Sequence, residues 1–193
     1  MNICVFCSSS NAINKVYFEA TQKLGELIGK GGHHLINGGA NVGLMEAATI
    51  AASKAGASTT GVIPEKMIGR SLASDNSHKV VVTKDMMERK AHMRDISDAF
   101  IALPGGFGTL EEILEVITLR QLSYHHKPIV FVNTNNFFDH LLKQFELSYV
   151  ELFAKDIYRQ LYYVAETPEE AMEYIINYKE VELDSKWFKV PEK

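Results

Sequence analysis

A strand, a glycine-rich turn and the start of a helix follow one another between residues 99 and 115. Residues 99–103 are all apolar, as expected of a strand buried on both faces of a parallel sheet. The turn at 104–109 contains Gly105, Gly106 and Gly108, which allow a backbone to approach a ligand closely. The opening N–H groups of a helix lack partners within it and carry the positive end of its dipole. We therefore predict an anion site here, with phosphate as the expected ligand.

Acidic residues follow the turn at Glu111, Glu112 and Glu115. The turn lacks the Gly-Lys-Ser/Thr ending of a P-loop, and its glycines do not fit the G-x-G-x-x-G dinucleotide fingerprint. Two roles are open for Glu112. It could complete a capping box with Thr109 as the N-cap, or its carboxylate could act in catalysis beside the bound ligand. Both roles require Glu112 near the helix start, so its position favours neither.

Strands alternating with helices are expected to position these groups. Strand-like runs lie at 2–7, 34–36, 58–63, 80–83, 99–103, 129–132 and 161–164, and helical patterns at 16–28, 44–55, 86–96, 110–120, 137–149 and 168–178. This alternation predicts an α/β protein, a three-layer Rossmann-like fold with a mostly parallel sheet flanked by helices. Residues 65–79 show little periodicity and are expected to form a surface loop, with a mobile cover over the site as the alternative.

Ligands of such folds bind at the carboxyl ends of the strands. That rule gathers three loops around one crevice, at 8–11, 38–43 and 105–109. The first loop offers Ser9, and the second offers Gly38, Gly39 and Gly43 as further positions close to a ligand. We therefore include these four residues among the candidate binding positions.

Length and charge limit the remaining possibilities. The 193 residues are enough for one domain, expected at 1–178 with a peripheral tail at 179–193. A net charge of −4 argues against general binding to nucleic acid or to a membrane surface, since such proteins usually show a basic excess. The sequence has no apolar run of membrane-spanning length and no signal peptide pattern, so a cytoplasmic protein is expected.

The cysteine and histidine pattern does not predict a metal site. Cys4 and Cys7 are three residues apart in a strand and should point to opposite faces, as buried reduced thiols. The pairs at 33–34 and 125–126 are interpreted as surface or loop histidines, because no carboxylate or cysteine accompanies them at a useful spacing.

The helix after the glycine turn has apolar residues around most of its circumference. They are Leu110, Ile113, Leu114, Val116, Ile117 and Leu119. One sheet cannot cover such a wide apolar surface, so we favour a homodimer or larger homo-oligomer slightly over packing beneath the chain's own later helices.

Two motifs in this order resemble a known family. Met86-Met87-Glu88-Arg89-Lys90, followed by Pro104-Gly105-Gly106-Phe107-Gly108-Thr109-Leu110-Glu111-Glu112, is similar to the LONELY GUY family of cytokinin riboside 5′-monophosphate phosphoribohydrolases, long labelled lysine decarboxylases. The resemblance extends over 5–178. It implies hydrolysis of the N-glycosidic bond of a purine nucleoside 5′-monophosphate, such as AMP, to free base and ribose 5-phosphate, without cofactor or metal.

The resemblance also implies roles for individual residues. Arg89 and Glu112 fall on the catalytic positions of the family. Nucleotide contacts fall on Lys90, Gly106, Phe107, Gly108, Thr109, Leu110, Glu111 and Thr118, and the family works as dimers or larger assemblies. The chain departs from the family at Ser8, Ala40, Glu46 and Met87, which could change phosphate affinity or the choice of base.

Two other functions remain open on the same residues. Binding loops alone do not prove turnover, so a non-catalytic carrier of a nucleotide or of molybdenum cofactor is the alternative. Lysine decarboxylation would need pyridoxal phosphate held by a lysine, and Lys90 is the only lysine near the motifs.

Overall fold

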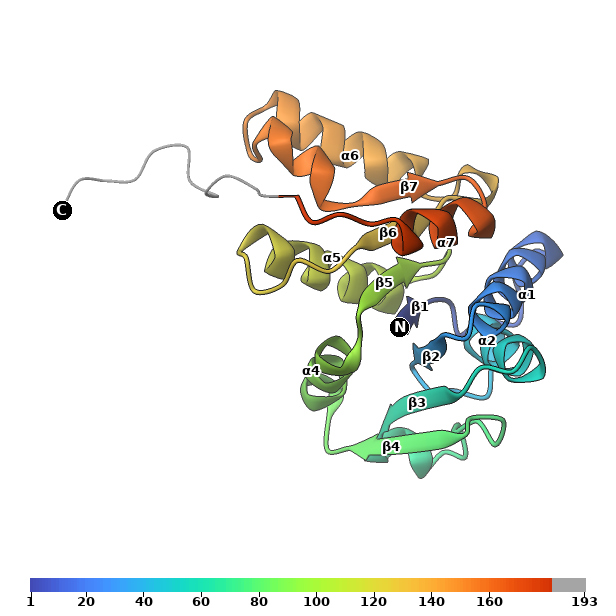
Figure 1. The fold of residues 1–193 in the computed structure, drawn as a ribbon. Helices are drawn as coiled ribbons and strands as arrows, with labels where there is room; N and C mark the ends of the chain where they lie inside the picture. The colour runs from blue at the N-terminus through green and yellow to red at the C-terminus, as the bar shows by residue number, and fades with distance from the viewer. Residues whose placement is uncertain (182–193) are drawn as a thin grey trace.

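A seven-stranded parallel sheet forms the middle layer of the computed structural model, which describes residues 1–181 (Figure 1). Its strands are β1 Asn2–Phe6, β2 His34–Asn37, β3 Thr59–Pro64, β4 Lys79–Thr83, β5 Ala99–Ala102, β6 Ile129–Val132 and β7 Tyr163–Ala165. They lie in the order β4-β3-β2-β1-β5-β6-β7, and each neighbouring pair is parallel. Of the predicted tail at 179–193, residues 182–193 lie outside the described part.

Helices cover both faces of this sheet. They are α1 Lys15–Lys30, α2 Gly43–Lys54, α3 Glu65–Ile68, α4 Met86–Ile96, α5 Phe107–Gln121, α6 Asp139–Val150 and α7 Pro168–Ile176, with short 3-10 helices η1 Thr134–Asn136 and η2 Asp156–Leu161. Apolar residues of α1, α2 and α7 form one core cluster with the sheet, and those of α4, α5 and the region of α6 form the other. The predicted three-layer α/β fold is confirmed.

The cysteines of β1 and its end lie on opposite faces of the sheet. Cys7 belongs to the core cluster with α1 and α2, and Cys4 to the cluster with α4 and α5. Both are free and buried, and burial raises the pKa of both thiols. The prediction of buried reduced cysteines is therefore confirmed.

The structure corrects three of the predicted boundaries. The segment at 65–79 begins with the short helix α3, and β4 already starts at Lys79. Strand β7 starts at Tyr163 because the preceding residues form η2. Helix α5 starts at Phe107 and so includes part of the glycine turn.

The order of the strands reverses its direction at β1. From β1 the sheet grows through β2, β3 and β4 on one side and through β5, β6 and β7 on the other, so the direction of winding changes there. Such a switch point is where ligands bind in folds of this kind. The loops that follow β1, β2 and β5 meet at this edge, as predicted. A Cβ on Gly43 would lie 2.6 Å from the Ser8 carbonyl oxygen, and a Cβ on Gly105 would lie 3.1 Å from the Ser8 backbone nitrogen.

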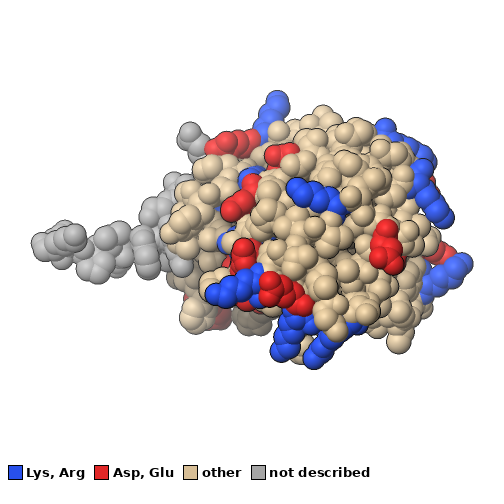
Figure 2. Space-filling view, turned by 90° about the horizontal axis from the view of Figure 1, so that it is seen from below, with Lys and Arg blue, Asp and Glu red and all other residues tan. Residues whose placement is uncertain are grey.

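Charged residues are interspersed on the surface. Figure 2 shows lysines and arginines alternating with acidic side chains over one face of the molecule. In the part of the chain that the structure describes, no helix combines the length and the apolar character needed to cross a membrane.

Candidate active site

Helix α4 begins with two reciprocal side-chain caps, which fix the position of Arg89 one turn further on. The Asp85 carboxylate accepts a hydrogen bond from the Glu88 N–H at 2.9 Å, and the Glu88 carboxylate accepts one from the Lys84 N–H at 2.8 Å. Arg89 Nε then donates to the carbonyl oxygen of Val62 at 2.9 Å. The guanidinium is thereby anchored to β3 and directed toward α5.

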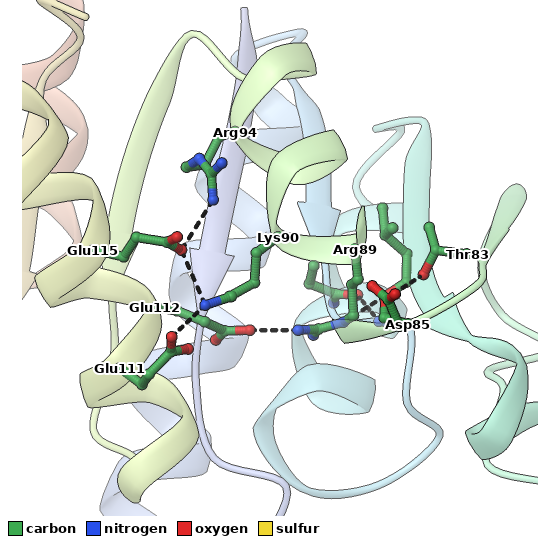
Figure 3. A network of polar contacts seen from close by, with 11 residues as sticks. Thr83, Asp85, Arg89, Lys90, Arg94, Glu111, Glu112 and Glu115 are labelled. Atoms are coloured by element: carbon green, nitrogen blue, oxygen red, sulfur yellow. Dashed lines mark hydrogen bonds and ion pairs between the residues drawn. The ribbon is translucent and has the colours of Figure 1, made fainter. Parts of the chain in front are cut away.

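Arg89 and Glu112 form a buried ion pair between α4 and α5. Arg89 Nη1 lies 2.5 Å from Glu112 Oε1, and the two side chains are only 8% and 11% exposed. Figure 3 shows the two groups pointing toward each other across the space between the helices. The two residues implied as catalytic by the family resemblance are thus in direct contact.

The capping interpretation of Glu112 is wrong. The N-cap of α5 is Gly106, which provides no side-chain cap, and Thr109 is already inside the helix. Glu112 therefore lies in the second turn, where its carboxylate meets Arg89 and cannot serve a capping box. The extended backbone at Gly106 allows the helix to start before Thr109.

The environment of Glu112 favours its protonated form. Burial raises the pKa of the Glu112 carboxyl, and the charge and hydrogen bond of Arg89 oppose this rise without cancelling it. A carboxyl pKa that is raised by burial beside a specific charged partner is typical of acids and bases in active sites.

The tip of α5 is open at the positions expected to hold an anion. A Cβ built on Gly106 or on Gly108 would meet no atom within 4 Å, and the Phe107 side chain is 92% exposed. Gly105 differs, because the Thr109 hydroxyl lies 2.1 Å from the place of its Cβ. The helix tip therefore has room for a ligand above Gly106 and Gly108, while Gly105 and Thr109 pack against each other.

A second group of charges lies beside the buried pair. Lys90 forms ion pairs with Glu111 and with Glu115, and Glu115 also binds Arg94 at 2.9 Å (Figure 3). The hydrogen bond to Glu111 raises the pKa of the Lys90 ammonium, although burial opposes it. A Schiff-base lysine requires a lowered pKa, so this environment does not suit Lys90 for pyridoxal phosphate chemistry.

The remaining candidate residues are distributed unevenly around the site. Leu110 is partly buried against the core, and Ser9 is exposed in the loop after β1. Thr118 lies nearly two helical turns beyond Glu112, with its hydroxyl donating to the carbonyl of Leu114 at 2.9 Å. Within one subunit Thr118 is therefore not gathered at the helix tip.

Glycines of the second turn face the chain itself. Gly39 and Gly43 have positive φ angles of 70° and 60°, which favour glycine. A Cβ on Gly39 would lie 3.0 Å from the backbone of Gly61. Gly38 lies against the Arg89 guanidinium. Whether any of these three glycines contacts the nucleotide stays a prediction.

One contribution to the site was missed by sequence reasoning. It is the Val62 carbonyl, a backbone group that no side-chain pattern reveals.

Glu46, one of the departures from the family pattern, has structural partners. Its carboxylate accepts hydrogen bonds from Ser74 at 2.5 Å and from Asn76 at 2.6 Å. Glu46 holds the segment after α3 against the second glycine turn, where Ser74 N–H donates to the Gly39 carbonyl at 2.9 Å.

The histidine pairs have structural partners. The His34 ring bonds to Ser58 at 2.5 Å and to Thr60 at 2.9 Å, and His125 Nε2 bonds to the Val116 carbonyl at 2.9 Å. Burial lowers the pKa of His125 to about 4. Among residues 1–181, no group of three or more His, Cys, Asp or Glu side chains could hold a metal ion.

Comparisons with known proteins identify the family of this chain. The family described as "Possible lysine decarboxylase" matches residues 45–175. A probable cytokinin riboside 5′-monophosphate phosphoribohydrolase, LOGL2 of Oryza sativa subsp. japonica, is 39% identical over 91% of this chain and 72% of its own length. The phosphoribohydrolase LOG5 of Arabidopsis thaliana is 35% identical over 93% of this chain and 78% of its own length. The chain belongs to the LONELY GUY family.

Solved structures with the same fold include a protein of another kind. A molybdenum cofactor binding protein from the phototrophic bacterium Rippkaea orientalis has a TM-score of 0.70 and 29% identity, covering 91% of this chain and 94% of that one. Its likeness confirms the fold. It also shows that the fold occurs in a protein named for binding rather than hydrolysis.

Proposed function

We propose that this protein hydrolyses the N-glycosidic bond of a purine nucleoside 5′-monophosphate, releasing the base and ribose 5-phosphate. One observation carries the proposal: a buried carboxylate, Glu112, lies just behind an open helix tip and is held by Arg89 at 2.5 Å. The N–H groups at the tip can bind a phosphate, and the carboxylate can stabilise positive charge on the sugar. The names of the LONELY GUY relatives support the same reaction.

The phosphate would bind to the free N–H groups at the start of α5. These groups and the helix dipole favour a dianion, and the open space at Gly106 and Gly108 admits it. Binding energy from the phosphate, which takes no part in bond cleavage, can then hold the ribose in line with Glu112. The exposed Phe107 ring stands at the same tip, within reach of other parts of the nucleotide.

Cleavage of the glycosidic bond develops positive charge on the sugar carbon, in an oxocarbenium-like state. The ionised Glu112 would stabilise this charge and hold the attacking water, accepting a proton from it. The C–N bond breaks, the water oxygen joins the sugar carbon, and the departing base takes up one proton, which balances the proton that Glu112 accepted from the water and releases when its carboxylate is regenerated. Arg89 orients the carboxylate and opposes the rise in its pKa, and its guanidinium can also bind ribose or phosphate oxygens.

The identity of the base is tested with a panel of nucleotides. The protein is incubated with AMP, an N6-prenylated AMP, GMP and IMP, and the released base is measured by chromatography. Release from at least one purine monophosphate in a one-to-one ratio with ribose 5-phosphate is expected. The matching nucleosides, which lack phosphate, serve as controls and should react far more slowly because the helix tip stays empty. The panel also shows whether AMP itself is a substrate.

A carrier function is the second candidate. It is favoured by the likeness to the molybdenum cofactor binding protein of Rippkaea orientalis, which has 29% identity over most of both chains. Tight binding of a nucleotide or of molybdenum cofactor, without any release of base over hours, would support the carrier and contradict hydrolysis.

We also propose that the protein forms a homodimer or larger homo-oligomer. In α5 and the turn after it, Leu114, Leu122 and Tyr124 are 36%, 41% and 76% exposed. Near the end of α6, Val150 and Phe153 are 71% and 87% exposed. A second copy covering this apolar surface would also bring another subunit close to Thr118. Light scattering across a dilution series would show a dimer, whereas a monomer at all concentrations would contradict it.

A further inference from the structure

The space above Gly38 is filled by the guanidinium of Arg89. A Cβ atom built on Gly38 would lie 2.2 Å from Arg89 Nη2 and 2.7 Å from the sulfur of Met45. Both separations are too short for non-bonded atoms, so a side chain at this position would displace Arg89 or Met45. Gly38 is absent from the glycines with positive φ, so its backbone conformation would accept alanine. Glycine is required here for room.

We propose that Gly38 is a positioning residue for Arg89 rather than a nucleotide contact. Each nitrogen of the guanidinium then has its own neighbouring group. Nε is bound to the Val62 carbonyl at 2.9 Å, Nη1 meets Glu112 at 2.5 Å, and Nη2 lies over Gly38. A planar group limited on three sides has one orientation, and that orientation directs Nη1 at the carboxylate. We call this arrangement the arginine slot.

The other glycines of the same turn support this assignment. Gly39 packs on the backbone of Gly61, and Gly43 packs on the loop around Ser8. The turn is therefore enclosed by the chain, in contrast to the open positions at Gly106 and Gly108. A phosphate can reach Gly106 and Gly108 without displacing protein. Gly38, Gly39 and Gly43, in contrast, pack against other parts of the chain.

The experiment has two arms. The first measures the kinetics of Gly38→Ala, and this arm rests on the proposed function. Moving a catalytic group by about 1 Å can cost on the order of 100-fold in rate, so kcat should fall by about 10- to 100-fold. The acid limb of the pH–rate profile should also move to higher pH, because a displaced Arg89 stabilises the Glu112 anion less. Gly69→Ala is the matched control, since its Cβ would meet nothing closer than 3.9 Å. Unchanged kcat and an unchanged acid limb in Gly38→Ala would overturn the proposal.

A stability cycle tests the slot without any activity. Gly38→Ala is introduced into the wild type and into the double variant Arg89→Ala/Glu112→Gln, which empties the slot without leaving a buried unpaired anion. In the wild type, overpacking should lower Tm by about 3 to 10 °C. In the double variant the loss should be clearly smaller, because the contact with the Met45 sulfur remains but the closer one with Arg89 is gone. Equal losses in both backgrounds, or failure to fold in both, would overturn the proposal. Folding only in the emptied background would support it.

The two arms separate the slot from the proposed function. If the wild type releases no base from any nucleotide, the proposed hydrolysis fails, but the stability cycle still decides whether Gly38 makes room for Arg89. If the wild type is active and the cycle shows equal losses, the hydrolysis stands and the slot fails.

Discussion

Glu112 has two requirements that oppose each other. Its carboxylate must be ionised to stabilise positive charge on the sugar, yet burial raises its pKa and favours the neutral form. Arg89 resolves this conflict in part, because its charge and hydrogen bond lower the pKa of the same carboxyl. The activity of the site should therefore depend on pH through this single pair.

The first prediction concerns the pH dependence of activity. Because the pKa of Glu112 is raised, the acid limb of kcat/KM should lie above about 4.3, the usual pKa of a glutamate. Replacement of Arg89 by Ala removes the opposing effect and should move the limb further upward, in addition to lowering the rate. Profiles measured for both proteins under the same ionic strength provide the test. A limb that moves downward in Arg89→Ala would contradict the assignment.

The second prediction concerns stability and the same pair. A carboxyl with a raised pKa binds its proton more tightly in the folded state, so folding stability falls as pH rises from the usual glutamate pKa to the raised value. Loss of Arg89 leaves the buried anion without its partner, at a cost of about 3 to 5 kcal/mol once Glu112 is ionised. Urea unfolding of Arg89→Ala should show a smaller loss at pH 5 than at pH 8. Arg89→Ala/Glu112→Gln, as the control, should show no such pH dependence of the loss.

At the scale of elements, the site depends on the starts of two helices. Helix α4 is capped by Asp85 and Glu88, which places Arg89, while α5 starts at Phe107 and its N-cap, Gly106, provides no side-chain cap. The uncapped start leaves N–H groups available for an anion. In the proposed function this start binds the phosphate, whereas the caps of α4 hold Arg89 in place.

The third prediction compares two neighbouring glycines that immediately precede α5. Alanine at Gly105 would place its Cβ 2.1 Å from the Thr109 hydroxyl, so Gly105→Ala should lose stability by about 1 to 3 kcal/mol. Alanine at Gly106 meets no protein atom within 4 Å but enters the space expected for phosphate. Gly106→Ala should therefore keep its Tm and bind nucleotide more weakly. Thermal unfolding and calorimetric titration with AMP measure both effects. Full affinity in Gly106→Ala would argue against phosphate at this tip.

At the scale of the molecule, much of the fold could be predicted from local patterns. The apolar runs of β1, β5 and β6 and the cap and proline at 167–168 locate elements closely, because burial on both faces and helix capping leave local signals. The gathering of the three loops followed from the general rule for parallel sheets. The start of α5 was harder to predict, because Thr109 is a typical N-cap residue although the N-cap in the structure is Gly106.

The contacts inside the site could not be predicted in the same way. Arg89 and Glu112 are 23 residues apart and meet only because α4 and α5 lie side by side. The family resemblance implied a catalytic role for each residue, and spacing alone does not predict their contact. The Val62 carbonyl and the space above Gly38 have no signature in the sequence. The position of a backbone oxygen, and the side chain that occupies the room beside a glycine, depend on the folded arrangement.

The fourth prediction, the effect of Glu112→Gln, tests the central claim most directly. Base release and nucleotide affinity are measured side by side for this variant and the wild type, with the substrate chosen from the panel. The amide keeps the shape of the side chain but can neither carry the charge nor accept the proton, so the rate should fall by about 100- to 10,000-fold while the affinity changes little. Release of base at the wild-type rate would remove Glu112 from the mechanism and contradict the account.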